Sequence, residues 1–297
     1  MSDKGWGSRE FAEAWKKRAD ERRATMAMVT DRMFAAAWLR PGMRVLDLGT
    51  GTGDTAVEAA QRVAPQKEGD RAGSVLATDG SEAMIELARE AVEASGVKNV
   101  EVRRMDAGHI DVEPSSFDAV IGRQVLMFVD PAAAFRGIYR ALRPGGHVAA
   151  TVWGPLRDNP YHAMAITVAK RRAGAAALGL GLPPGLAQAL SATGPAPEIE
   201  RAFSVGDPAV WTRAIEEAGL QEVKAEQVLG ARRFGSGEAA LAAMKDSPIH
   251  REPIDRLPPE EQAAAWAELA AMCEVTGGTF GTLHFVISGW KPGRLEV

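Results

Sequence analysis

The chain has 297 residues, of which 46% are apolar, a formal net charge of −4 and one cysteine, Cys273. This length and apolar content allow a large buried core, and the interspersed charges lack the basic stripe of nucleic-acid binders. One cysteine excludes an internal disulfide and a Cys-rich zinc site, and no segment reaches the ~20 apolar residues of a membrane span. With a charged N-terminus unlike a signal peptide, we expect a cytoplasmic protein that acts on a small molecule, without a metal, a membrane or a nucleic-acid partner.

The first 40 residues predict two helices, which end at Pro41-Gly42. Strands and helices then alternate up to Trp153. Short strands rich in Val, Ile, Leu and Ala are expected at 44–48, 74–79, 100–104, 117–122 and 147–152. Helices are expected between them, at 54–63, 82–95 and 131–142. This pattern is typical of a parallel sheet that helices bury on both faces, and it predicts a doubly wound α/β fold.

The regular alternation breaks after Trp153. Residues 155–206 are rich in Gly, Ala and Pro, with one helix expected near 161–173. Further helices are expected at 209–218, 237–245 and 259–272, and strands at 222–229 and 282–289. We therefore predict a cofactor-binding core at 41–154, a cap insertion at 155–206, a C-terminal part of the core at 207–297, and N-terminal helices (1–40) that belong to the cap.

The segment VLDLGTGTGD (45–54) predicts a ligand site. An apolar strand runs into Gly49, Gly51 and Gly53, and a helix follows at once, so that a nucleotide-like ligand can lie against the bare backbone. A dinucleotide is disfavoured because the spacing is not G-x-G-x-x-G, and because Asp54 would repel a pyrophosphate.

Polar residues follow the next three strands. Asp79 ends the second strand, where a carboxylate can accept both hydroxyls of a ribose, although it could instead cap a helix. Asp106 follows the third strand and can accept from an adenine amino group, although it could be a simple turn residue. Arg123 and Gln124 follow the fourth strand. Since these strand ends meet at one edge of the sheet, we expect all four residues to line the cofactor site.

Together these segments resemble the class I methyltransferases that use S-adenosylmethionine, in the branch that includes ubiquinone and menaquinone biosynthesis enzymes and many natural-product enzymes. The resemblance covers residues 40–154. It implies a seven-stranded sheet, with the last strand antiparallel between strands five and six. It also implies that Asp47 and the loop with Thr50 contact the methionine part, that Asp79 binds the ribose and that Asp106 meets the adenine. The adenosine pocket would be lined by Gly80, Met84 and Ala107.

The sulfonium of this cofactor is already an activated methyl donor, so the protein mainly has to position the acceptor. A hydroxyl acceptor would need a general base, for which His162 in the segment DNPYH (158–162) is the best candidate. The alternative is a purely structural histidine. His284 alternates within the last strand, and His250 lies in what reads as a Pro-rich linker. The segment Asp158–Tyr161 lacks the second proline of amino-methylating DNA enzymes and follows the wrong strand, which disfavours nucleic-acid methylation.

The N-terminal helices and the 155–206 insertion are expected to close over a largely apolar acceptor that is O- or C-methylated. Glycines of the insertion would give such a lid its hinges. The candidate hinges are Gly174, Gly179, Gly181 and Gly185. The candidate pocket residues, which could equally be core, are Trp15, Met26, Met33, Tyr161, Met164, Ile166, Leu178, Leu180 and Leu182. Alternatives are a natural-product cyclase that keeps the cofactor pocket, a ligand sensor and a nicotinamide dehydrogenase. The acceptor, the methylated atom and the oligomeric state stay open.

Overall fold

A computed structural model of the chain describes residues 9–179 and 202–293. Its contacts divide it into two compact units. The first comprises Met1–Gly154, Val205–Val228 and His284–Val297, and the second comprises Pro155–Ser204 and Leu229–Leu283. The sequence predicts that all of 207–297 belongs to the core, whereas 229–283 group with the insertion in the structure. Leu180, Gly181, Leu182 and Gly185 lie outside the described residues.

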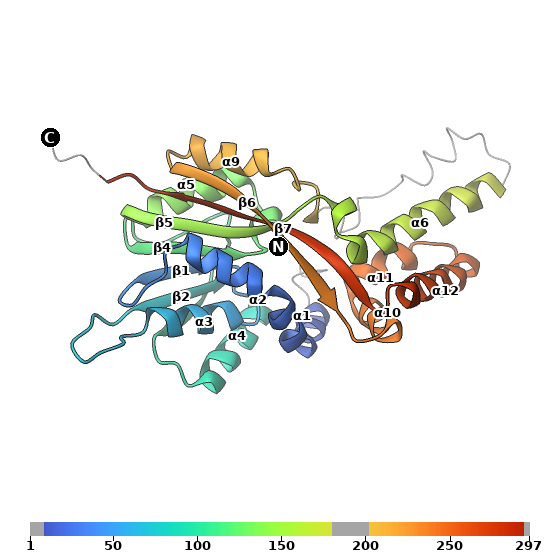
Figure 1. Cartoon of the computed structure of the whole chain (residues 1–297), viewed down its shortest axis with the longest axis horizontal. Helices are drawn as coiled ribbons and strands as arrows, with labels where there is room; N and C mark the ends of the chain where they lie inside the picture. Colours follow the sequence, from blue (N-terminus) through green and yellow to red (C-terminus); the bar gives the residue numbers. More distant parts are fainter. Residues whose placement is uncertain (1–8, 180–201, 294–297) are drawn as a thin grey trace. The chain divides into compact units, whose positions relative to one another are not determined.

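A seven-stranded sheet crosses the first unit in the order β3-β2-β1-β4-β5-β7-β6 (Figure 1). The strands β1 to β5 pair in parallel, and β7 is antiparallel to β5. This confirms the predicted fold, including the insertion of the last strand between the fifth and the sixth. The strands are β1 (Arg44–Leu48), β2 (Ser74–Asp79), β3 (Val100–Arg104), β4 (Phe117–Arg123), β5 (Leu142–Trp153), β6 (Gln221–Arg233) and β7 (Thr279–Trp290).

Several helices of the first unit begin at residues whose side chains accept hydrogen bonds from free backbone N–H groups. Ser81 Oγ accepts from the backbone N–H of Met84 at the start of α4, and Asp130 does the same for Ala133 of α5. A left-handed Gly96 ends α4. The helices are α1 (Arg9–Lys17), α2 (Ala19–Ala36), α3 (Asp54–Val63), α4 (Glu82–Ser95), α5 (Pro131–Ala141) and α9 (Pro208–Glu217), with a short 3₁₀ helix η2 (Leu126–Phe128).

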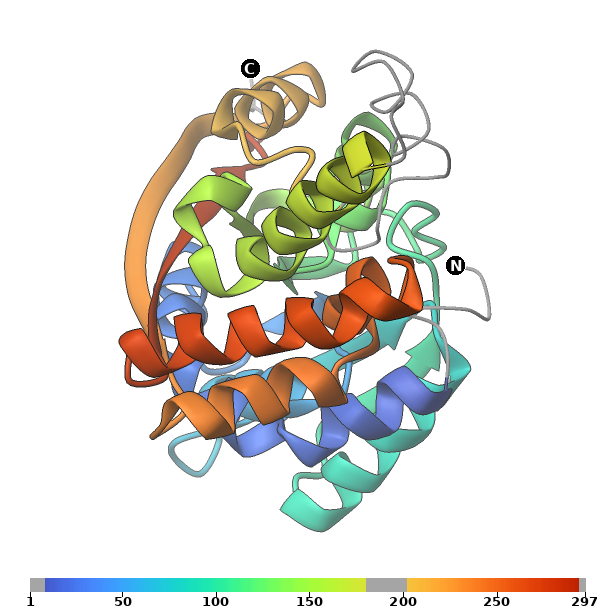
Figure 2. The same ribbon diagram turned by 90° about the vertical axis from the view of Figure 1, so that its right-hand side faces the viewer.

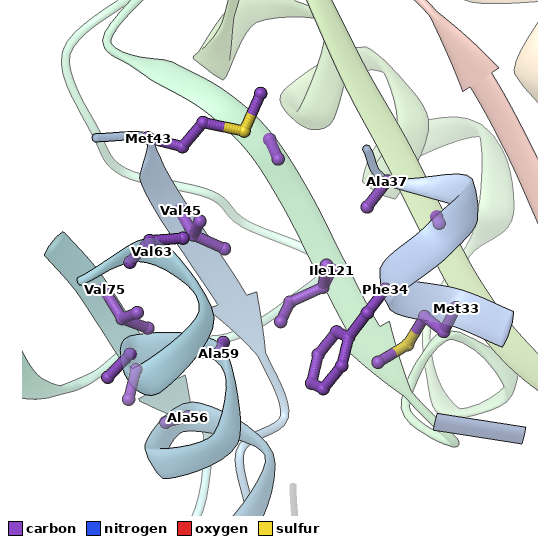
Figure 3. Packing of buried hydrophobic residues seen from close by; sticks show 14 of the residues in the cluster. Met33, Phe34, Ala37, Met43, Val45, Ala56, Ala59, Val63, Val75 and Ile121 are labelled. Atoms are coloured by element: carbon purple, nitrogen blue, oxygen red, sulfur yellow. The ribbon is translucent and has the colours of Figure 1, made fainter. Parts of the chain in front are cut away.

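The core on one face of the sheet lies between α2, α3 and the central strands. Figure 3 shows Phe34 and Met33 of α2 beside Ile121 of β4, with Ala59 of α3 against the same strands. Met26 belongs to this cluster as well. Burial of each large apolar side chain stabilises the folded state by roughly 1.5–3 kcal/mol. The helix α2 is therefore a part of the hydrophobic core and not an exposed cover. This assigns Met26 and Met33 to the core and not to an acceptor pocket.

Helices form most of the second unit. The helix α6 (Pro160–Gly179) packs on α11 (Pro248–Asp255) and α12 (Pro259–Val275), and α12 packs on α10 (Gly237–Asp246), as Figure 2 shows. A 3₁₀ turn, η3 (Leu156–Asp158), precedes α6. Tyr161 and Met164 lie in the core of this unit. Of the two roles that the sequence allowed for them, pocket or core, the structure shows the core.

The helix α11 corrects the linker predicted around His250. Pro248 occupies the first turn, where its missing N–H costs nothing, while Pro253 lies inside the helix. Ile249, His250 and Ile254 are buried. Packing of these side chains outweighs the low helix propensity of a segment with two prolines.

Candidate cofactor site

The glycine loop turns through left-handed backbone conformations that suit glycine. The φ angles are 65° at Gly49, 56° at Gly51 and 84° at Gly53. A Cβ at Gly49 would lie 2.3 Å from a methyl carbon of Val125, and one at Gly53 would lie 3.0 Å from the Cα of Ala88. The loop is therefore wedged between α4 and the segment after β4, and its backbone is presented at the carboxyl edge of the sheet.

Asp47 is fully buried one residue before the end of β1. Within the described chain, no hydrogen bond of normal geometry reaches either of its carboxylate oxygens or the buried Thr50 hydroxyl. Burial raises the pKa of Asp47 to about 7, although the nearby Thr50 hydroxyl and the charge of Arg123 act in the opposite direction. A buried carboxylate without partners is costly, so this one fits a cationic ligand that completes it.

Asp79 lies at the end of β2 and binds the glycine loop. Its Oδ2 accepts from the Gly51 N–H at 3.0 Å, and its Oδ1 accepts from the Ser81 N–H at 2.9 Å. Burial raises its pKa, and the charge of Asp106 adds to the effect. Since the hydroxyl of Ser81 caps α4, Asp79 is not the capping residue of that helix. Its carboxylate is fixed beside the loop, at the place where the ribose of the cofactor is predicted to bind.

The predicted adenosine residues gather around the same edge. Met84 and Ala107 are buried, and Arg104 Nε donates to the Gly80 carbonyl at 3.2 Å. The exposed Asp106 accepts from the Gly108 N–H at 2.7 Å. This is the turn contact considered as an alternative for Asp106, and a contact of Asp106 with adenine stays a prediction.

Arg123 forms a buried ion pair with Asp54, and its other amino group donates to Thr30 Oγ1 at 3.1 Å. The pair holds the pKa of Asp54 below its usual range against the opposing effect of burial. Because Arg123 compensates the charge of Asp54, Asp54 would repel a pyrophosphate less than the sequence indicated. The glycine spacing still disfavours a dinucleotide.

Gln124 follows β4 in a left-handed conformation, with φ 58°, and its Nε2 lies 3.0 Å from His284 Nδ1 of β7. Its Oε1 is buried and has no hydrogen-bond partner in the part of the chain that the structure describes. Burial lowers the pKa of His284 to about 4, so the ring stays neutral, and it packs in a tilted arrangement against Trp153, with 4.4 Å between the ring centroids. The sequence did not reveal this pair, because 160 residues separate its members.

His162, the predicted base, lies in the second unit. Its Nδ1 is 2.9 Å from His250 Nε2, and His250 Nδ1 is 2.8 Å from Ser247 Oγ. Burial lowers the pKa of His250 to about 3. His162 is therefore part of a buried chain of hydrogen bonds with His250 and Ser247, which no motif in the sequence indicated.

The first unit thus has the features that a nucleoside with an amino-acid side chain requires. A bare backbone loop lies beside the carboxylate of Asp79, and the buried carboxylate of Asp47 precedes the same loop. Among residues 9–179 and 202–293, no group of three or more His, Cys, Asp or Glu is placed to hold a metal ion. None of the described helices is long and apolar enough to span a membrane.

Comparison with known proteins confirms the resemblance to S-adenosylmethionine-dependent methyltransferases. Residues 39–176 match the family model described as a methyltransferase domain. The chain is 40% identical over 116 residues to an arsenite methyltransferase of Halobacterium salinarum, covering 39% of this chain and 28% of that protein. It is 34% identical over 108 residues to a demethylmenaquinone methyltransferase of Lactococcus lactis, covering 36% of this chain and 40% of that protein. The chain thus spans less than half the length of these relatives.

The fold agrees with the same class. The crystal structure of the YcgJ protein from Bacillus subtilis superposes with a TM-score of 0.56 at 15% sequence identity, covering 89% of this chain and 97% of that chain. The strand order, the antiparallel β7 and the glycine loop therefore define a Rossmann-like methyltransferase fold.

Proposed function

We propose that this protein transfers the methyl group of S-adenosylmethionine to a small, largely apolar acceptor, by O- or C-methylation. The observation that carries the proposal is the buried Asp47, whose two carboxylate oxygens and Thr50 neighbour lack hydrogen-bond partners within the described residues. The amino group of a bound methionine moiety would supply the missing donor and charge. Two relatives with methyltransferase names support the activity.

The site residues divide the work of binding. Asp47 would hold the ammonium group, the loop backbone would lie along the methionine, and Asp79 would accept from the ribose hydroxyls. When bound, the cofactor supplies a methyl group that is already activated by its sulfonium. The protein's remaining task is to orient the acceptor, and Asp106, Met84 and Ala107 would fix the adenosine end against which that orientation is defined.

Two groups are candidates on the acceptor side. The amide of Gln124, fixed by His284, lies on the segment whose next residue, Val125, packs against Gly49. Its buried Oε1 would accept from an O–H or N–H of the acceptor. His162 stays the proposed general base for a hydroxyl acceptor, with His250 orienting its ring. We also propose that the protein acts in natural-product biosynthesis and that it is located in the cytoplasm.

The test is the formation of S-adenosylhomocysteine. The protein, S-adenosylmethionine labelled in its methyl group and fractionated metabolite extracts should give a product with the mass of one added methyl group. Asp47→Asn should abolish the signal, whereas Asp111→Asn, an exposed carboxylate of the same unit, should keep it. A protein that binds the cofactor but never forms S-adenosylhomocysteine would be the cyclase or the sensor, and one that binds NAD instead would be the dehydrogenase.

A further inference from the structure

A cavity of about 300 Å³ lies in the first unit, between the C-terminal end of α2 and the strands β5, β6 and β7. His147 of β5 and Trp290 of β7 are paired neighbours in the sheet, and both line the cavity. In the parallel part of the sheet, His147 lies level with Ala119 of β4, and Ala119 lies level with Val45 near the start of β1. The glycine loop follows the other end of β1, so this cavity is separate from the cofactor site.

An exposed tryptophan forms one wall of the cavity. Trp38 follows the end of α2 in a left-handed conformation, with φ 53°, and it is 61% exposed. Its indole stacks on the ring of His147, with 5.2 Å between the ring centroids and 10° between the ring planes. Glu222 of β6 also lines the cavity and also has a left-handed backbone, with φ 47°. Such strain in bulky residues concentrates at sites that bind ligands.

The second tryptophan of the cavity has a hydrogen-bond donor without a partner. Nε1 of Trp290, the last residue of β7, is buried, and no acceptor lies within hydrogen-bond distance of it in the ranges 9–179 and 202–293. A buried N–H that stays unpaired lowers the stability of the folded state, so such groups nearly always have a partner. A ligand that offers an oxygen acceptor in the cavity would supply it.

The charged side chains around the cavity balance each other. Arg32 of α2 pairs with Glu226 of β6 at 3.4 Å, and Lys224 and Glu222 add one charge of each sign. Burial lowers the pKa of His147, so its ring is neutral at pH 7. A neutral ligand is therefore more complementary to this cavity than an ion.

We propose that this cavity binds a neutral, planar aromatic molecule that carries a carbonyl group. The ring of the ligand would pack against the stacked Trp38 and His147, and its carbonyl oxygen would accept from Trp290 Nε1. The cavity volume lies at the lower end of the range for ligand pockets, which suits one or two fused rings. The inference is independent of the proposed function, because the residues that line the cavity are all different from the predicted cofactor residues.

The experiment titrates the full chain with three probes that share one ring system. 1-Indanone has a neutral carbonyl, indane lacks it, and indane-1-carboxylate replaces it with a charge. Spectra of ¹H–¹⁵N pairs show the indole N–H groups of the seven tryptophans and also give the Kd of each probe. Trp290→Phe removes the donor and identifies its signal, and Trp38→Leu removes the stacked ring. The matched control is Trp266→Phe, a half-buried tryptophan of the second unit.

We expect 1-indanone to shift the Trp290 signal and to bind at least about tenfold more tightly than indane, which leaves the N–H unpaired. Indane-1-carboxylate should bind more weakly than 1-indanone. In Trp290→Phe the Kd values of 1-indanone and indane should agree within about twofold, and Trp38→Leu should weaken 1-indanone about fivefold. The control variant and saturating S-adenosylhomocysteine should leave the Kd of 1-indanone within about twofold of wild type.

Three results would overturn the inference. The first is an unshifted Trp290 signal or equal affinity of wild type for 1-indanone and indane. The second is competition between 1-indanone and S-adenosylhomocysteine, which would place the probe in the cofactor site. The third is a wild-type dimer that Trp38→Leu dissociates in sedimentation experiments, because this face would then bind a second copy of the chain. If Trp38→Leu does not fold, the probe pair on wild type and Trp290→Phe decide.

Discussion

The glycine loop of the first unit and the histidine chain of the second unit both contain buried titratable side chains. They differ in whether the fold supplies hydrogen-bond partners for these side chains. In the second unit, His250 uses both ring nitrogens, one toward Ser247 and one toward His162. In the first unit, the carboxylate of Asp47 has no such partner among the described residues. The fold supplies partners for both ring nitrogens of His250, whereas it leaves Asp47 for a ligand to complete.

This difference has a consequence for stability. The hydrogen bonds of His250 contribute to the stability of the folded state, since each buried hydrogen bond is worth about 0.5–1.5 kcal/mol. An uncompleted carboxylate costs stability until its ligand binds, which is the usual trade-off at functional sites. The two regions should therefore respond in opposite directions to mutation and to pH.

The largest effect is expected for Asp47→Asn. Cofactor affinity should fall about 100-fold or more, because a charge-assisted contact to the ammonium is lost. The ligand-free variant should be more stable than wild type at pH 8 by about 1–3 kcal/mol, since the cost of burying a charge disappears. Calorimetry measures the first and urea unfolding the second. A destabilised variant would show that Asp47 is a structural residue.

His250→Gln should act in the opposite sense on stability. The buried chain loses its central ring, and the free energy of unfolding should fall by about 2–3 kcal/mol at pH 8. Cofactor affinity should stay within about twofold of wild type, because His250 belongs to the second unit. Hydrogen exchange of the α11 amides measures the loss of stability, and calorimetry measures the cofactor affinity. A cofactor affinity that dropped with the stability would break the distinction between the two regions.

Acidification sharpens the same comparison. Unfolded His250 takes up a proton below about pH 6.5, whereas the folded ring stays neutral down to about pH 3. The unfolded state therefore binds more protons, and stability falls as pH falls through this window, by about 1.4 kcal/mol per unit for this residue. Urea unfolding at pH 7 and pH 5 should show a steeper loss for wild type than for His250→Gln.

Asp47 has the reverse sign. Its pKa in the ligand-free protein is raised to about 7, so between pH 3.8 and about 7 the folded state holds the extra proton, and this residue's contribution to stability falls as pH rises. Binding an ammonium requires the carboxylate, so affinity for S-adenosylhomocysteine should rise up to about tenfold per pH unit between pH 5.5 and 7. In Asp47→Asn this dependence should vanish. A flat wild-type profile would contradict the assignment.

The smallest effect is expected for Ser247→Ala. It removes the partner of His250 Nδ1 and should cost about 1 kcal/mol, again without an effect on the cofactor. The loss should be confined to the second unit, and hydrogen exchange that slowed or stayed unchanged in α11 would show that Ser247 adds nothing to the chain.

The sequence was informative where local patterns decide the structure. Glycines at 49, 51 and 53 behind an apolar strand and Asp79 at the end of the next strand act within a few residues, and the structure has them as predicted. The helix α11 was missed because local propensity argues against two prolines, and tertiary packing of Ile249 and Ile254 overrides it.

By itself, then, the sequence determined the alternation of strands and helices and the glycine loop, because hydrophobic patterning and backbone freedom are encoded locally. The place of the last strand and the class of ligand came from the resemblance to a methyltransferase family. Tertiary structure alone decided the partners of the charged groups. It paired Arg123 with Asp54, joined Gln124 to His284 and His162 to His250, and held Trp15 against Gly51 through Arg22. These contacts join residues far apart in the chain, and whether a buried charge is compensated depends on which of them folding brings together.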